Sequence, residues 1–225
     1  MSEFLDILKH YDVLGAFWVN IQLTFWGALL ALVIGTVLAV MRISPLSSLR
    51  WAGATYVNIV RNTPLTVIMT FLVLAVWTQL KISLAHDFAL NFFLFAVAGL
   101  GVYHAAFVCE AIRSGVNTVP AGQAEAARAI GLPFLAAARI VVLPQAFRGA
   151  VAPLGNTLIA LLKNSTVAVA ASVATESSGA MKTMIEFRPD YLWPIFLTFA
   201  VGFVVLVIPI GLATTGLSRR LAVTR

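Results

Sequence analysis

Charged side chains are scarce in this chain of 225 residues, since only 11% are Asp, Glu, Lys or Arg and 60% are hydrophobic. A soluble domain carries about 25% charged residues. So little charge with so much apolar surface excludes an intrinsically disordered chain. A single soluble core of this size could not bury that surface either. The composition therefore predicts an integral membrane protein.

Cysteine and catalytic motifs are scarce as well. Cys109 is the single cysteine and lies within an apolar run, which excludes a disulfide-built secreted domain. Three scattered histidines and this cysteine predict no metal site. The sequence contains no G-x-x-x-x-G-K-[ST] motif, so we expect no ATP site on this chain. These absences argue against an enzyme.

Apolar runs occupy most of the chain, and a helix needs about 20 such residues to cross a bilayer. We therefore predict an all-α integral membrane protein with five transmembrane helices. The expected spans are 17–41, 55–80, 89–110, 149–174 and 192–217. A segment 1–16 precedes them, a loop 113–148 separates the third span from the fourth, and a tail 218–225 follows.

The distribution of Lys and Arg predicts the orientation, because cytoplasmic loops carry an excess of both. With the N-terminus outside and the C-terminus in the cytoplasm, the inner segments hold ten of these residues and the outer segments four. The first span follows acidic residues and is too long for the apolar part of a signal peptide, so we expect no cleaved leader. The basic residues are scattered singly, so the net charge of +6 does not indicate nucleic-acid binding.

Small residues lie four apart on one face of the first span, at Gly27, Ala31 and Gly35. Such residues let two helix backbones approach closely. Either packing within the chain or an interface between subunits would use this face.

The loop 113–148 predicts two short helices presented to the cytoplasm. Good helix formers fill 123–130, with Glu125 expected in the first turn. Gly131 should end this helix with a positive φ. A second helix should begin at Pro133 and end at Pro144. An amphipathic connector lying on the membrane surface is the alternative for this loop.

This loop resembles the cytoplasmic signature of ABC importer permeases, in which E-A-A is followed by three residues, G, nine residues, I, one residue and L-P. Six of these seven positions match over 20 residues, and Val141 replaces the usual isoleucine. The matching residues are Glu125, Ala126, Ala127, Gly131, Leu143 and Pro144.

Further segments resemble the polar amino acid permeases within that family. They are VRNTPL at 60–65, GQAEAAR at 122–128, LPQA at 143–146, PLGN at 153–156 and LLKNS at 161–165. Together they extend the resemblance over 17–217, as an ABC type-1 transmembrane domain. Segments 61–66 and 153–161 look most like glutamate-type permeases.

The resemblance implies a permease, surrounded by membrane lipid, that works with three kinds of partner. These are a second permease chain, either identical or a sister, an ATP-binding subunit homodimer that holds ATP and Mg²⁺, and an extracytoplasmic binding protein that delivers the amino acid. It implies that the loop docks on the ATP-binding subunit. The docking residues are then Gln123, Glu125, Ala126, Ala127, Arg128, Gly131, Leu143 and Pro144.

Polar residues within the apolar segments are candidates for a substrate pathway. Lys163 lies 14 residues into its span, at a depth of ~20 Å, where a cation is costly. It could meet the carboxylate of a passing amino acid, or it could snorkel to the interface or pair with an acid. The candidate pathway residues are Lys163, Asn164, Asn156, Thr166, Arg61 and Thr63.

A secondary carrier or channel would often show internal repeats, and the sequence has none. A lipid-modifying enzyme would need clustered carboxylates or a set of His and Cys residues near an interface, and the sequence shows neither. Arg61 and Thr63 could anchor the chain at the inner membrane face instead of lining the substrate pathway. Glu110 should pair with Arg113 three residues later on one helix.

Overall fold

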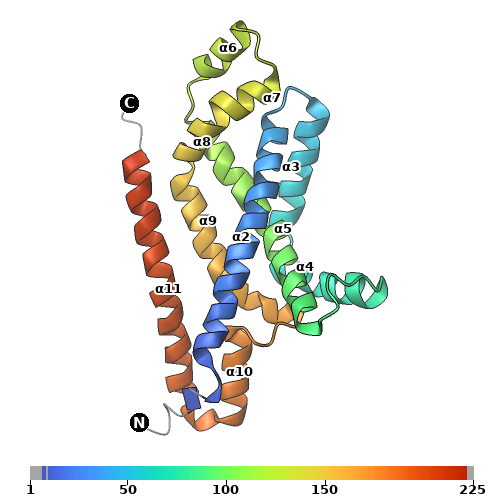
Figure 1. The fold of residues 1–225 in the computed structure, drawn as a ribbon, viewed down its shortest axis with the longest axis vertical. Helices are drawn as coiled ribbons and strands as arrows, with labels where there is room; N and C mark the ends of the chain where they lie inside the picture. The colour runs from blue at the N-terminus through green and yellow to red at the C-terminus, as the bar shows by residue number, and fades with distance from the viewer. Residues whose placement is uncertain (1–6, 9, 222–225) are drawn as a thin grey trace. The chain divides into compact units, whose positions relative to one another are not determined.

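The computed structural model describes residues 7, 8 and 10–221, and every regular element within them is a helix (Figure 1). The predicted all-α fold is thereby confirmed. Several charges used for the orientation lie outside the described residues, and so does the end of the expected tail. These charges are Glu3, Asp6, Lys9 and Arg225.

Four helical segments are long and apolar enough to cross a membrane. They are α2 (Val13–Ile43), α5 (Phe88–Val116), α9 (Val151–Asn164) with the 3-10 helix η3 (Ser165–Ala171), and α11 (Leu192–Leu221) preceded by the 3-10 helix η4 (Pro189–Tyr191). A continuous helix satisfies its own backbone hydrogen bonds, as lipid requires.

The span expected at 55–80 is broken into separate helices. α3 (Ser47–Arg61) ends before Pro64, and α4 (Leu65–Phe71) then continues as the π-helix η1 (Leu72–Gln79). Pro64 has no N–H to donate, and Thr63 Oγ donates instead to the Ile59 carbonyl at 2.9 Å. The break falls at Thr63-Pro64, as expected of a proline that interrupts helical hydrogen bonding. The bent pair counts as a fifth span only when both parts are taken together.

The loop between α5 and α9 folds largely as predicted, with two corrections. α6 (Ala121–Ala129) begins right after Pro120, so Glu125 lies beyond the first turn and not within it. Gly131 has φ +85°, which confirms the predicted positive φ. α7 (Phe134–Ala137) leads into the π-helix η2 (Ala138–Val142) and α8 (Leu143–Gly149).

Pro144 does not end the second helix, contrary to the prediction. It occupies the first turn of α8, directly after the π-helical turn of η2. Leu143 N donates five residues back, to the Ala138 carbonyl, and Pro144 after it has no N–H to donate. The widened turn before it thus lets the helical path continue.

The chain forms two compact units, which we describe separately. Within the described residues, the first unit takes the parts up to Ala28, 64–100 and 160–209, and the second takes 29–63, 101–159 and the part from Ile210. The remaining long element, α10 (Ser177–Phe187), belongs to the first unit.

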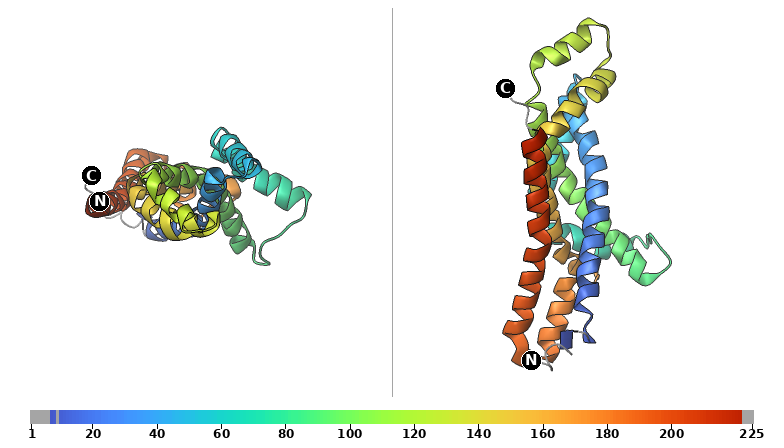
Figure 2. Two further views of the ribbon diagram at one scale, coloured as in Figure 1. Left: turned by 90° about the horizontal axis from the view of Figure 1, so that it is seen from above. Right: turned by 60° about the vertical axis from the view of Figure 1, so that its left-hand side comes forward.

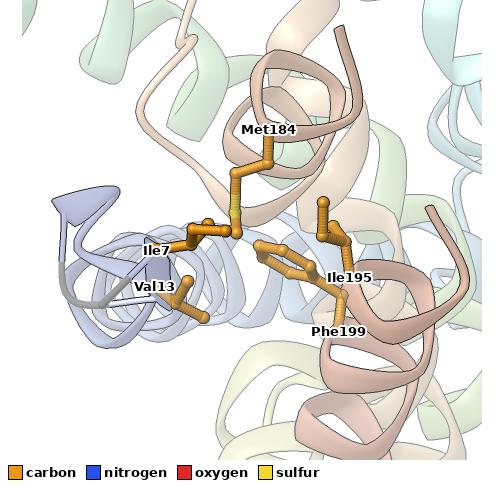
Figure 3. Packing of buried hydrophobic residues seen from close by; sticks show 5 residues of the cluster. All are labelled: Ile7, Val13, Met184, Ile195 and Phe199. Atoms are coloured by element: carbon orange, nitrogen blue, oxygen red, sulfur yellow. The ribbon is translucent and has the colours of Figure 1, made fainter. Parts of the chain in front are cut away.

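A cluster of buried apolar side chains holds one end of the first unit together. Met184 of α10 points toward Ile195 and Phe199 of α11, and Ile7 and Val13 close the cluster from the N-terminal side (Figure 3). All five are under 8% exposed. Ile195 and Phe199 belong to a candidate span, where such contacts stabilise by van der Waals packing and not by transfer out of water.

Close packing of α2 against α5 uses the small residues of α2. In the first unit, a β-carbon added at Gly27 would lie 3.2 Å from Leu100 Cβ. In the second, one added at Gly35 would lie 2.6 Å from Val108 Cγ1 and 2.8 Å from the Ala105 carbonyl. Ala31 is fully buried. Of the two predicted uses of this face, the structure shows packing within the chain.

Candidate functional site

The short helix α6 is the most exposed regular element of the second unit, where it stands beyond α7 and α8 (Figures 1 and 2). Ala127 is its one buried residue, at 4% exposure, and Ala124 is half-buried. Gly122, Glu125 and Ala126 are exposed on the other side. Two of these exposed residues, Gly122 and Ala126, have small side chains, which keep this part of the face slim.

The eight predicted docking residues divide by exposure. Gln123, Glu125, Ala126, Arg128, Gly131 and Pro144 are exposed, Leu143 is half-buried, and Ala127 is buried against its own chain. Three large apolar side chains on the same loop are strongly exposed: Ile130 at 79%, Leu135 at 67% and Ile140 at 65%. Apolar side chains of comparable exposure also occur along the candidate spans, for example Leu212 at 70%.

An ionic cluster joins α2 to α5 at the ends of both helices in the second unit. Arg42 at the end of α2 contacts Glu110 of α5 through Nη1 and Oε1. Arg113 Nε lies 3.8 Å from the second oxygen of Glu110. The predicted pair between Glu110 and Arg113 is confirmed, and Arg42 is a partner that the sequence analysis missed.

In the first unit, Lys163 lies in the last turn of α9 and is exposed. A cation there is favoured by the partial negative charge of the helix C-terminus. The helix tightens into η3 at the next residues, where Thr166 Oγ donates to the Lys163 carbonyl at 2.8 Å. Asn164 is half-buried beside it. Three of the predicted pathway residues thus meet at one helix junction.

The other three pathway candidates belong to the second unit. Arg61, at the end of α3, lies over the Phe107 ring of α5 at 5.6 Å, a cation–π arrangement. Thr63 takes part in ending α3, as described above. Asn156 is exposed on α9. The structure therefore gives Arg61 and Thr63 clear local roles in packing and in the helix end.

A buried polar cluster next to the Lys163 junction was missed by the sequence analysis. Glu176 is fully buried, and its carboxylate caps α10 by accepting from Ser178 N and Gly179 N at 2.8 Å each. Asn20 of α2 donates to Ser165 Oγ at 2.8 Å and to Glu176 Oε2 at 3.3 Å, and it accepts from Ser177 N at 2.9 Å.

Burial and hydrogen bonding act on Glu176 in opposite directions. Burial, the larger effect, raises the pKa of this carboxyl above its ordinary value, while the hydrogen bonds from Ser178, Gly179, Asn20 and Ser177 lower it. Its position just before Ser-Ser-Gly is the sequence signal for a helix cap.

Comparison with known proteins gives the family. Residues 16–223 match the family described as "Binding-protein-dependent transport system inner membrane component". The glutamate transport system permease protein GluC of Corynebacterium glutamicum is 46% identical over 95% of this chain and 96% of its own length. The glutamate/aspartate import permease protein GltJ of Escherichia coli is 30% identical over 91% of this chain and 85% of its own.

Solved structures agree on the fold. The chain resembles one described as an amino acid ABC transporter with histidines, with a TM-score of 0.79 at 24% identity over 96% of this chain and 98% of the other. The MetNI methionine ABC transporter gives a TM-score of 0.74 at 24% identity, with the same two coverages. The fold, the exposed loop helix and the match over nearly the whole sequence lead to one assignment: the chain belongs to the inner membrane components of binding-protein-dependent transport systems.

Proposed function

We propose that this chain is the permease subunit of an ATP-driven importer for glutamate or a closely related amino acid. The observation that carries the proposal is the 46% identity to GluC over 95% of the chain. The family makes the chain a membrane-embedded transport component, so the ATP that drives transport is hydrolysed on a separate subunit. A second permease copy or sister chain and an extracytoplasmic binding protein complete the proposed assembly.

In this proposal, α6 carries the motion of the ATP-binding subunits to the spans. Its exposed face, around Glu125 and Ala126, would enter a groove on that subunit. The buried Ala127 would hold α6 against its own chain. The exposed Ile130, Leu135 and Ile140 support a loop that is covered in the complex. They also suit the alternative of a loop lying on the lipid surface.

The proposed orientation places α6 in the cytoplasm and the N-terminus outside. The excess of arginine in the loop and around the inner ends of α2 and α5 supports it. The ionic cluster of Arg42, Glu110 and Arg113 would then lie at the inner membrane surface.

The direct test is uptake of labelled glutamate into proteoliposomes that contain the complete transporter. We expect uptake that needs both the binding protein and ATP, and that a non-hydrolysable ATP analogue does not support. Uptake without ATP would favour a secondary carrier and overturn the proposal. Uptake of another amino acid in preference would overturn the glutamate part alone.

For the substrate pathway, we propose that Lys163 meets the substrate carboxylate at the junction of α9 and η3. Its exposed side chain and the cation-favouring helix end support this role. The variant Lys163→Met keeps most of the length of the side chain and removes its charge. We expect a higher Michaelis constant for uptake, with ATP hydrolysis by the complex retained. Unchanged uptake and Michaelis constant would remove Lys163 from the pathway.

A further inference from the structure

A cavity of about 680 Å³ lies in the second unit, beside α6. The end of α2 and the turn after it line one part through Ile43 and Ser44, and the last residue of α5, Val116, lines another. α6 contributes Arg128, and the loop after it contributes Leu132. None of the mechanistic steps proposed above uses this cavity.

The lining combines a positive charge with an apolar wall. Nine of the twelve lining residues are apolar, two are Arg50 and Arg128, one is Ser44, and no acidic side chain is among them. An occupant complementary to this lining has an anionic head and an apolar body. A free inorganic anion would leave the apolar wall unused, and a purely apolar molecule would leave two guanidinium groups unmatched.

Arg50 is held in place on one side. Its Nη1 donates to the carbonyls of Ser44 and Pro45 at 2.8 Å each. An arginine has five N–H donors in a fixed fork, so further donors remain for an anion. These two hydrogen bonds fix the cation next to the cavity and lower the entropy lost when it binds a phosphate.

The position of the cavity indicates which amphiphile is at hand. α2 and α5 are both candidate membrane spans, and the cavity adjoins the ends of both. In the proposed orientation the expected spans end at 41 and 110, which places the cavity beside the inner layer of lipid headgroups. Basic pockets between spans at this level bind the headgroups of acidic phospholipids.

The geometry points to a binding site for an anionic phospholipid in this cavity, with the phosphate on Arg50 and Arg128 and the start of the acyl chains on the apolar wall. The lipid would contact both the end of α2 and α6. This site does not depend on which amino acid the protein carries.

The test measures lipid retained by the full-length chain. The protein is reconstituted in vesicles of equal parts phosphatidylglycerol and phosphatidylcholine, extracted in detergent and analysed by native mass spectrometry. We expect phosphatidylglycerol to be enriched over phosphatidylcholine on the wild type. Arg128→Gln should reduce the enrichment about fivefold, the effect of losing one cationic contact at a membrane surface. Arg128→Lys, which keeps the charge, should retain most of it.

Two further variants separate a built site from general attraction to the surface. Arg139→Gln and Arg148→Gln remove the same charge from exposed positions of the same loop that do not line the cavity, and they should leave the enrichment unchanged. Leu132→Trp keeps both arginines but fills the cavity, and it should lower retention. Equal losses with Arg139→Gln and Arg128→Gln, or full retention with Leu132→Trp, would overturn the site. Because no uptake is measured, failure here leaves the proposed transport function untouched.

Discussion

Glu176 is a carboxylate whose burial and hydrogen bonds act against each other. Its four donors fit an ionised acceptor, while its full burial disfavours the charge and, on balance, raises its pKa. A group whose pKa is higher in the folded than in the unfolded state stabilises the fold below its unfolded pKa. That contribution is lost as the pH rises through the folded pKa.

The first prediction follows from this loss of stability with rising pH. Glu176→Gln cannot ionise, and it places an amide N–H₂ against backbone donors at the start of α10, which should cost about 1–3 kcal/mol. The difference in melting temperature between the wild type and the less stable variant should be larger near about pH 4 than near about pH 8. Thermal melts of the detergent-solubilised protein measure the difference. A difference that stays constant or grows with rising pH would contradict the raised pKa.

Gly131 supplies a second prediction at this scale. Its φ is +85°, and a β-carbon added there would meet nothing within 4 Å, so the cost of a side chain is conformational alone. Gly131→Val should destabilise the loop by about 1–2 kcal/mol, whereas Gly131→Asn should be tolerated, because asparagine adopts left-handed backbone more easily. ATP-coupled uptake should fall for the valine variant and persist for the asparagine variant. Equal uptake by both variants would show that this turn does not matter for coupling.

Between elements, α2 is fixed to its neighbours by small residues and by one polar side chain. A β-carbon at Gly35 would lie 2.6 Å from Val108 and 2.8 Å from the Ala105 carbonyl, whereas the nearest atom to one at Gly27 is Leu100 Cβ at 3.2 Å. Gly35→Ala should therefore destabilise the protein by about 1–3 kcal/mol, and Gly27→Ala by clearly less. Thermal melts of the two variants side by side provide the matched comparison. A larger loss at Gly27 would contradict the packing described for α2.

The amide of Asn20 joins α2 to η3 and to α10. Its partners are Ser165 of η3, Glu176 at the cap of α10 and Ser177 in the first turn of α10. Asn20→Ala would leave Ser177 N buried without its acceptor, at a cost of about 1–3 kcal/mol, and would remove two donors as well. We expect a clear drop in melting temperature, with Gln22→Ala on the same helix as the control. A drop of the same size in Gln22→Ala would show that the loss is not specific to the cluster.

Local features of these elements could be predicted from the sequence, and distant contacts could not. The positive φ of Gly131 and the pair of Glu110 with Arg113 depend on residues close in sequence, and both were predicted. Asn20 lies 145 residues from Ser165, so no spacing rule connects them. The continuation of α8 through Pro144 depends on a π-helical turn that the residue types do not specify. The predicted pathway residues remain untested by the fold.

At the scale of the whole molecule, the fold and the family point to a subunit that transports a solute and does not itself hydrolyse ATP. Its long helices satisfy their own backbone hydrogen bonds, as lipid requires. The loop between α5 and α9 carries exposed apolar side chains. The account rests on the face of α6 that carries Glu125 and Ala126, outside the cavity, being covered by the ATP-binding subunit and not by lipid.

Cross-linking from α6 tests this claim most directly. Cys109 is fully buried, so a new cysteine at Ala126→Cys on the exposed face of α6 can be labelled selectively with a photoactivated cross-linker. In the assembled transporter, this position should cross-link to the ATP-binding subunit, and the exposed Thr175→Cys of the first unit should not. Cross-linking of Ala126→Cys to lipid alone, with the ATP-binding subunit present and bound, would contradict the account.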